Sequence, residues 1–324
     1  MFSRPSCLAA LAVLLACPAA IARPSNDQQG MDVMEQYFQG QMGLNQAINR
    51  IQFLGAERLA CAELVHALKR SSDRKLRPQF FDFLSQVAVR DNDVERMLLN
   101  GLGSDDASES IPAARGLGRI KAETAVKPLN AALEHKVLGV RREAARSLGK
   151  IGNPASGPPL MKAAKAETDL DVKILMLASV GLTGDKKQIA PLEALLKDES
   201  ESTRMAAARG LCAMGTPSCA TFANKLLASA DKNERFSAVM LFEGAPAKAA
   251  APVLSKVLED KDVKLRARAA RLLVEGGDQS KLAWLVIESA KAKGEERLPY
   301  EDELERLRMT DEQRQAILKK AGLQ

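Results

Sequence analysis

The stretch VRREAARSLGKIG (140–152) decides the fold prediction, because it returns in weaker form as TRMAAARGLCAMG (203–215) and LRARAARLLVEGG (265–277). Each copy has a basic residue at its second position, an alanine pair three and four positions later, and a glycine eleven positions later. The basic residue recurs at spacings of 32, 31, 31 and 31 positions, as Arg141, Lys173, Arg204, Arg235 and Arg266. A repeat of this length predicts a stacked array, in which no unit buries its apolar face alone.

Each repeat is predicted to form two helices. The first runs through the basic residue and ends near the glycine, which tolerates the left-handed conformation that closes a helix. The second begins near a proline 17 or 18 positions after the start of its repeat, at Pro128, Pro159, Pro191 and Pro252. Proline is tolerated in a first helical turn because that N–H has no acceptor within the helix. The alanine pairs allow neighbouring helices to approach closely.

These three stretches resemble HEAT repeats, and among them the short kind of the phycobilisome lyases. The resemblance covers about 108–295, which would hold about six repeats of ~31 residues. It implies an all-α fold, a right-handed α-solenoid of stacked helical hairpins. It is specific for the fold and weak for function, because such repeats occur in scaffolds, adaptors and a few enzymes.

Both ends of the chain depart from the repeat. Residues 30–107 are predicted to be a divergent helical region or an N-terminal cap, and GLGSDDASES (101–110) is predicted to be its boundary. Residues 296–324 are predicted to be a helical C-terminal cap, whose last helix is opened by a capping box from Thr310 to Gln313. Such a cap would close the last apolar face of the array.

Residues 1–22 are predicted to be a signal peptide. The apolar core CLAALAVLLA (7–16) is too short to span a bilayer, and cleavage after Ala22 would follow a small-x-small pattern. Alternatively, LLAC (14–17) resembles a bacterial lipobox, in which Cys17 would be lipidated. Both alternatives predict an exported bacterial protein in the periplasm or cell envelope, as an outer-membrane lipoprotein if Cys17 is lipidated. No other segment approaches the 18 apolar residues of a membrane span.

Composition argues against several ligand classes. The net charge is +6 and is spread along the repeats, and aromatic residues make up only 4% of the chain. Neither property is typical of a nucleic-acid-binding protein.

Cys212 and Cys219 are close enough in sequence for a disulfide in an oxidising compartment, or they are two small buried thiols. Cys61 is expected to be a buried small residue.

No group of residues in the sequence has the composition and spacing of a catalytic or metal-binding site. His66 and His135 have no further ligands at metal-binding spacing, so we predict no metal site, no cofactor and no catalytic residue. The repeated basic residues are expected to form ion pairs and caps between repeats, with acids of the preceding turn, rather than a ladder that binds anions. A second stripe lies 21 positions after the basic residue of its repeat, and it contains Lys162, Lys225 and Lys256. It is either a groove for an acidic peptide or a solvated helix face.

These observations predict an exported, non-enzymatic scaffold or adaptor, which holds a protein or peptide partner along the concave face of the solenoid. The alternative is a lyase-type or other enzyme built on HEAT-like repeats. We set bilin-lyase activity aside here because an exported chain would not meet that cytosolic substrate. A pocket that contains His135 or perturbed acids would favour the enzyme.

Overall fold

The computed structural model describes residues 25–323, which form α-helices and short 3-10 helices and contain no strand. They divide into two compact units, with the boundary after Ser179, inside a helix. The predicted signal peptide, with Cys17 and Ala22, lies outside the described residues. No helix within the described part is long and apolar enough to cross a membrane.

The first unit contains α2 (Ser25–Phe38), α3 (Leu44–Leu54), α4 (Glu57–Arg70), α5 (Arg77–Val87), α6 (Asn92–Leu102), α7 (Ala107–Arg119), α8 (Val126–Ala132), α9 (Leu138–Ile151), α10 (Gly157–Ala166) and most of α11 (Leu170–Leu182), with the 3-10 helices η1 (Glu123–Ala125) and η2 (Pro154–Ser156). The second unit contains η3 (Lys186–Gln188), α12 (Ile189–Leu195), α13 (Glu201–Ala213), α14 (Pro217–Leu227), α15 (Lys232–Met240), α16 (Ala247–Val257), α17 (Val263–Glu275), α18 (Ser280–Lys291), η4 (Gly294–Arg297), α19 (Leu298–Arg306) and α20 (Asp311–Lys320).

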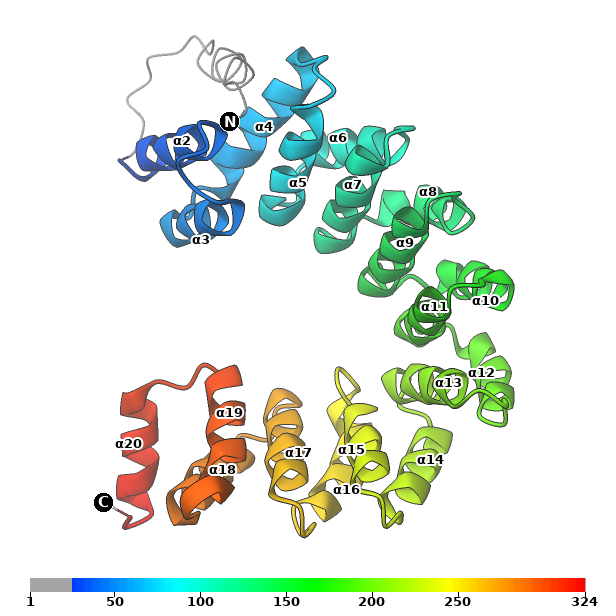
Figure 1. Ribbon diagram of the computed structural model, residues 1–324, viewed down its shortest axis with the longest axis vertical. Coiled ribbons are helices and arrows are strands. Elements are labelled where there is room, and N and C mark those ends of the chain that lie inside the picture. Colours follow the sequence, from blue (N-terminus) through cyan, green and yellow to red (C-terminus); the bar gives the residue numbers. More distant parts are fainter. Residues whose placement is uncertain (1–24, 324) are drawn as a thin grey trace. The chain divides into compact units, whose positions relative to one another are not determined.

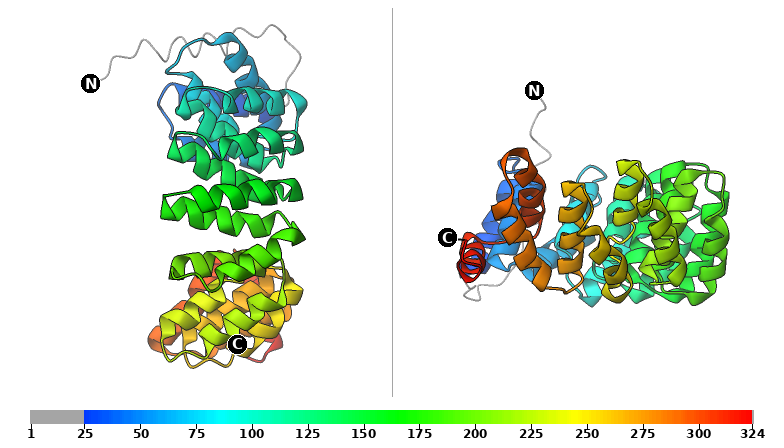
Figure 2. Two further views of the ribbon diagram at one scale, coloured as in Figure 1. Left: turned by 90° about the vertical axis from the view of Figure 1, so that its right-hand side faces the viewer. Right: turned by 90° about the horizontal axis from the view of Figure 1, so that it is seen from below.

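The helices of each unit stack as the repeat predicts. Alternate helices pack on one another, as α5 on α7 and α7 on α9 in the first unit, and α15 on α17 in the second. The intervening helices fill a second layer, as α14 and α16 do. Figure 1 shows the helices of each unit in chain order and in two layers, with α7 and α9 in one and α8 and α10 in the other, and the left view of Figure 2 shows helices stacked one on another. The fold is therefore an all-α solenoid of stacked helical hairpins.

Glycines end the first helices of the repeats. Gly152, Gly184 and Gly215 have φ angles of 76°, 71° and 69°, the left-handed conformation in which glycine has no steric penalty. In the repeat with Ala245-Pro246, Gly244 takes this conformation instead, with φ of 75°.

Two expectations about the segments between helices need correction. Pro252 does not open a helix, because α16 already begins at Ala247. The stretch 101–110 is not a break in the packing, because only residues 103–106 separate α6 from α7 and these helices are in contact. The stack therefore continues through the predicted boundary.

Small residues allow the close packing of α7 on α9. A β-carbon placed on Gly118 would lie 2.5 Å from Oγ of Ser147 and 2.8 Å from its Cα. The Ser147 hydroxyl in turn donates to the carbonyl of Ala114 at 2.8 Å, which satisfies it inside the core. The two backbones are therefore closer here than any larger side chain allows.

The repeated arginines join one repeat to the next, but their partners differ from those predicted. Nη1 of Arg235 donates to the carbonyls of Ser229 and Ala230 at 3.2 and 3.0 Å, and Nε donates to Asp260 of the following turn at 3.1 Å. Arg204 makes the same bonds to the carbonyls of residues 198 and 199, both at 2.8 Å. The preceding turn thus supplies main-chain carbonyls, and the carboxylate comes from the turn that follows.

Two acids of the turns before these arginines form caps, as the sequence predicted. Asp231 and Asp262 are N-caps, which accept backbone N–H groups at the starts of α15 and α17. Such a cap satisfies a donor that has no acceptor within its own helix. Arg77, in the N-terminal region, makes the same kinds of contact as the repeated arginines. It donates to the carbonyl of Leu68 at 3.0 Å and to the carboxylate of Glu109 at 2.8 and 3.1 Å.

The last two helices cover the final repeat. Tyr300 and Leu304 of α19 join a buried cluster with Leu285 and Val286 of α18, and side chains of α20 pack against it. The predicted capping box at the start of α20 is confirmed. Glu301 accepts hydrogen bonds from Ser289 of α18 at 2.6 Å and from Nη1 of Arg314 at 2.7 Å. These bonds, chiefly those from Arg314, lower the pKa of Glu301 to about 2.

Candidate functional site

An open cavity of about 430 Å³ lies in the first unit, where the turn between α8 and α9 faces the end of α10. Polar and charged groups surround a small apolar floor. The cavity is lined by Leu133, Glu134, His135, Lys136, Arg141, Lys162, Ala163, Ala166, Glu167 and Thr168. We refer to it as the His135 cavity.

Arg141 fixes two walls of the His135 cavity. Its Nε and Nη2 donate to the two carboxylate oxygens of Glu167 at 2.7 and 3.0 Å, and Nη1 donates to the carbonyl of His135 at 3.0 Å. Paired bonds of this kind fix orientation as well as distance. The side chains of Arg141 and Glu167 are only 19% and 3% exposed. The hydrogen bonds from Arg141 are the main reason that the pKa of Glu167 is lowered. This pair is therefore a rigid part of the wall.

The ring of His135 is held by the backbone of its own turn. Nδ1 accepts a hydrogen bond from the N–H of Val137 at 3.0 Å. In the neutral ring the proton then resides on Nε2, because only one ring nitrogen of a neutral imidazole carries hydrogen. His135 is thereby set up to donate a hydrogen bond to an acceptor in the cavity.

Lys162 and Glu134 form an ion pair at the edge of the cavity. Nζ of Lys162 lies 2.8 Å from Oε1 of Glu134, and the side chains are 78% and 68% exposed. The hydrogen bond from Lys162 lowers the pKa of Glu134. An exposed pair of this kind contributes little to stability. An anionic ligand could therefore replace Glu134 as the partner of Lys162 at small cost.

The structure brings only one residue of the predicted lysine stripe to this site. Lys225 of α14 and Lys256 of α16 are exposed and belong to the second unit, and neither lines the His135 cavity. His135 and Arg141 were not predicted as site residues. One signal in the sequence points to them, which is a constant spacing. His135 lies six residues before Arg141, and Arg204, Arg235 and Arg266 likewise donate to the carbonyl of the residue six positions before them.

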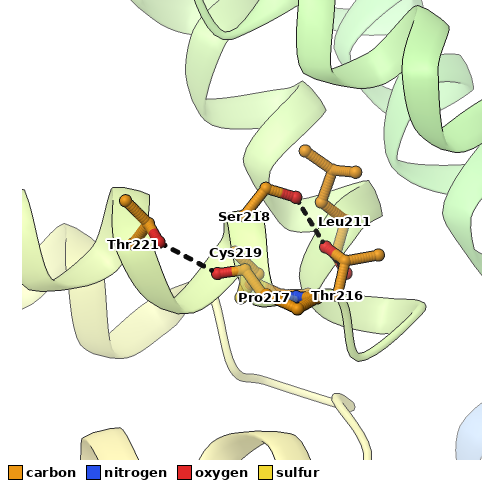
Figure 3. The surroundings of a disulfide bond; sticks show 7 residues. Leu211, Thr216, Pro217, Ser218, Cys219 and Thr221 are labelled. Carbon is orange, nitrogen blue, oxygen red and sulfur yellow. Dashed lines mark hydrogen bonds between the residues drawn. A yellow bond between two sulfur atoms is a disulfide. The ribbon is translucent and has the colours of Figure 1, made fainter.

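The two remaining cysteines of the predictions lie together in the second unit. The structure joins Cys212, near the end of α13, to Cys219, in the first turns of α14, with their Cα atoms 4.9 Å apart. Figure 3 shows hydroxyl groups around this turn: Thr216 and Ser218 lie 3.0 Å apart, and Thr221 donates to the carbonyl of Pro217 at 3.2 Å. The turn is remote in sequence from the His135 cavity and shares no lining residue with it.

His66 lines a separate cavity near the N-terminus, which is described below. Within residues 25–323 no group of three or more His, Cys, Asp or Glu residues could hold a metal ion.

Comparison with known proteins identifies the repeats. The family of HEAT repeats matches residues 94–179 and 157–227. Two curated relatives are named bilin biosynthesis protein PecE. The one from Mastigocladus laminosus is 35% identical over 60 residues, which are 18% of this chain and 22% of the relative. The one from Nostoc sp. strain PCC 7120 is 38% identical over 58 residues, which are 18% of this chain and 23% of the relative. The chain therefore matches less than a quarter of the length of either relative.

A solved structure has the same fold. The complex of CpcE and CpcF of phycocyanin lyase from Nostoc sp. PCC 7120 aligns with a TM-score of 0.51 at 20% identity. The alignment covers 78% of this chain and 94% of the matched chain.

The comparisons correct the functional prediction. A non-enzymatic scaffold that binds its partner along the concave face is contradicted, because both curated relatives are named for bilin biosynthesis. The fold predicted from the repeats is confirmed by the family match and the solved structure. Residues 94–227 of the chain match HEAT repeats, and the chain has the fold of a HEAT-like solenoid.

Proposed function

We propose that this chain is the ligand-binding component of a lyase-type enzyme, and that its ligand is a bilin or a related open-chain tetrapyrrole. The local identity of 35% and 38% with two bilin biosynthesis proteins carries this proposal. The His135 cavity supports it, because it gathers hydrogen-bond donors around an apolar floor within the segment that matches HEAT repeats. A protein partner, as the sequence predicted, would complete the enzyme.

The chemistry of the cavity suits one end of such a ligand. A bilin carries carboxylate side chains on an extended apolar ring system. Lys162 can exchange Glu134 for a ligand carboxylate, and the Nε2 hydrogen of His135 supplies a second donor. The floor of Leu133, Ala163 and Ala166 gives a ring edge an apolar contact.

We assign His135 to binding rather than to proton transfer. Nδ1 already accepts the hydrogen bond from Val137, so Nε2 is the ring nitrogen left to contact a ligand. As the N–H of the neutral ring, Nε2 can orient a ligand oxygen as a hydrogen-bond donor.

Titration of the full-length chain with biliverdin, followed by its visible absorbance, tests the proposal. We expect the double variant His135→Phe/Lys162→Ala to bind about tenfold more weakly than the wild type, because two hydrogen bonds to charged groups are lost. Lys225→Ala is the matched control, since this exposed lysine occupies the same position of another repeat and does not line the cavity. No binding by the wild type, or equal binding by both variants, would overturn the assignment.

We also propose that the chain is exported, in which case its ligand would be an open-chain tetrapyrrole outside the cytosol and not the cytosolic substrate that was set aside above. This proposal rests on the apolar core of residues 7–16 and the small-x-small pattern before Arg23. Mass spectrometry of the chain from a bacterial host tests it. An N-terminus at Arg23 indicates cleavage after Ala22, and a lipidated Cys17 indicates the alternative. Retention of residues 1–22 without lipid would refute export, and the bilin titration would stand unaffected.

A further inference from the structure

A second cavity, of about 390 Å³, lies in the first unit between α4 and the start of α6. One wall is a single face of α4, whose side chains recur at helical spacing: Arg58, Cys61, Ala62, Val65, His66 and Lys69. The other wall is the turn between α5 and α6 with the first turn of α6: Val89, Arg90, Asp91, Asp93 and Val94. We refer to it as the Cys61 cavity.

The charges of the Cys61 cavity are unevenly paired. Lys69 has an ion pair with Asp93 at 3.3 Å, and Asp91 caps the N-terminus of α6. Arg90 donates only to the carbonyl of Lys121, at 3.1 Å. Arg58 has no hydrogen-bond or ion-pair partner among residues 25–323. Two arginines thus line the cavity without an ion pair among residues 25–323, although the carboxylates of Asp91 and Asp93 line it too.

His66, which also lines the Cys61 cavity, has a ring nitrogen without a hydrogen-bond partner. Nδ1 of His66 is shielded from solvent and has no hydrogen-bond partner in the part of the chain that the structure describes. A shielded polar atom without a partner is costly, and such atoms are rare in folded proteins. Because Nδ1 is shielded, a ligand in the cavity could contact only the accessible part of the His66 ring, and the two arginines supply the polar groups that it could reach.

The floor of the Cys61 cavity is apolar and unreactive. Val65 and Val94 are buried, and the Cys61 thiol is 1% exposed and donates to the carbonyl of Val87 at 3.4 Å. Burial raises the pKa of this thiol to about 11. A protonated thiol is a poor nucleophile, so a ligand here would be held without a covalent bond.

We propose that the Cys61 cavity is a second ligand site, which binds a small organic carboxylate through an apolar tail against Val65 and Val94 and a head group between Arg58 and Arg90. Apolar walls with a few converging polar groups are the usual composition of a small-molecule site. The site shares no residue with the His135 cavity and does not depend on the bilin proposal.

Calorimetric titration of the full-length chain with octanoate tests this site. Ala62→Trp places a bulky ring in the cavity from an exposed position, so folding should be preserved, which circular dichroism would verify. We expect one octanoate per wild-type chain and binding at least tenfold weaker in Ala62→Trp. Ala131→Trp is the matched control, because Ala131 is an exposed helical alanine of the same unit that lines neither cavity, and it should bind as the wild type does.

A second variant tests the role of charge. Arg58→Gln should weaken octanoate binding roughly five- to tenfold, because a charge-assisted hydrogen bond is lost, and should leave octanol binding unchanged. Inorganic phosphate should not displace octanoate if the apolar tail is needed. No octanoate binding by the wild type, or equal binding by Ala62→Trp, would overturn the site. Equal octanoate binding by Arg58→Gln, or displacement by phosphate, would overturn its assignment to organic carboxylates.

Discussion

Replacement of Arg235 by alanine tests whether the repeated arginines join the repeats. The side chain of Arg235 is 6% exposed, and that of its partner Asp260 is 16% exposed. The substitution removes three hydrogen bonds and leaves a largely buried carboxylate without its cation. Loss of one partner from such a pair costs about 3–5 kcal/mol. Water can reach the freed carbonyls of residues 229 and 230, so we expect the lower end, about 3 kcal/mol.

Arg204 provides the internal control. It occupies the same position one repeat earlier and makes the same two bonds to carbonyls, but no carboxylate bonds to it. Arg204→Ala should therefore cost about 1 kcal/mol, the usual net value of neutral acceptors that become hydrated. Arg235→Lys should fall between the two, because a single ammonium cannot reproduce the planar fork of a guanidinium.

Urea unfolding followed by far-UV circular dichroism measures the difference. With a slope of about 2 kcal/mol per molar urea, the two alanine variants should differ in midpoint by about 1 M. A repeat protein can unfold in parts, so amide exchange should also show lost protection in α15 and α17 first. If Arg235→Ala were no less stable than Arg204→Ala, the carboxylate would contribute nothing and the proposed joint would be wrong.

The remaining predictions concern other contacts. Gly118→Ala should lower the free energy of unfolding in urea by about 1–3 kcal/mol, because the added β-carbon clashes with the backbone of Ser147. An unchanged urea midpoint would mean that α7 and α9 can move apart at no cost. Glu301 has its pKa lowered to about 2, so its contribution to the docking of α20 should be complete above pH ~4.5 and lost as the pH falls toward 2. Exchange of α20 amides should rise over that range, and Glu301→Gln should abolish the pH dependence. Reduction of the Cys212–Cys219 bond should cost about 2.5 kcal/mol from chain entropy. Free thiols at both Cys212 and Cys219, in addition to that of Cys61, found by mass spectrometry under non-reducing conditions, would contradict this pairing.

The fold could be predicted from sequence because its determinants are side chains with local requirements. Gly152 and Gly215 adopt the left-handed backbone conformation at the ends of helices, which favours glycine. Alanine and glycine are required where two helices approach closely. These requirements repeat at a fixed interval, so each copy supports the interpretation of the others. Pro252 was misplaced because a proline marks a first turn by preference only, and α16 continues through it.

The partners of the arginines could not be predicted in the same way. Arg141, Arg204 and Arg235 donate to main-chain carbonyls, which every residue type supplies, so residue types do not reveal these acceptors and only their constant distance from the arginine does. Arg77 escaped notice because the next repeat has Ser110 in place of the basic residue, so the series is interrupted there, and Glu109, the partner of Arg77, stands beside that position. A search for basic residues alone finds only one side of such a pair.

The position of the His135 cavity follows from a departure from the regular repeat. The spacing from Arg141 to Lys173 is 32 positions, against 31 in the repeats that follow. Correspondingly, α10 ends 25 positions after Arg141, whereas α12 and α16 each end 22 positions after their basic residue. Because α10 extends to Ala166, it is followed at once by Glu167, which Arg141 holds. The same arginine holds the carbonyl of His135, so a joint between repeats also fixes the two walls of the site. Removal of Arg141 should therefore impair ligand binding and stability together, whereas removal of Lys162, 78% exposed, should affect binding alone.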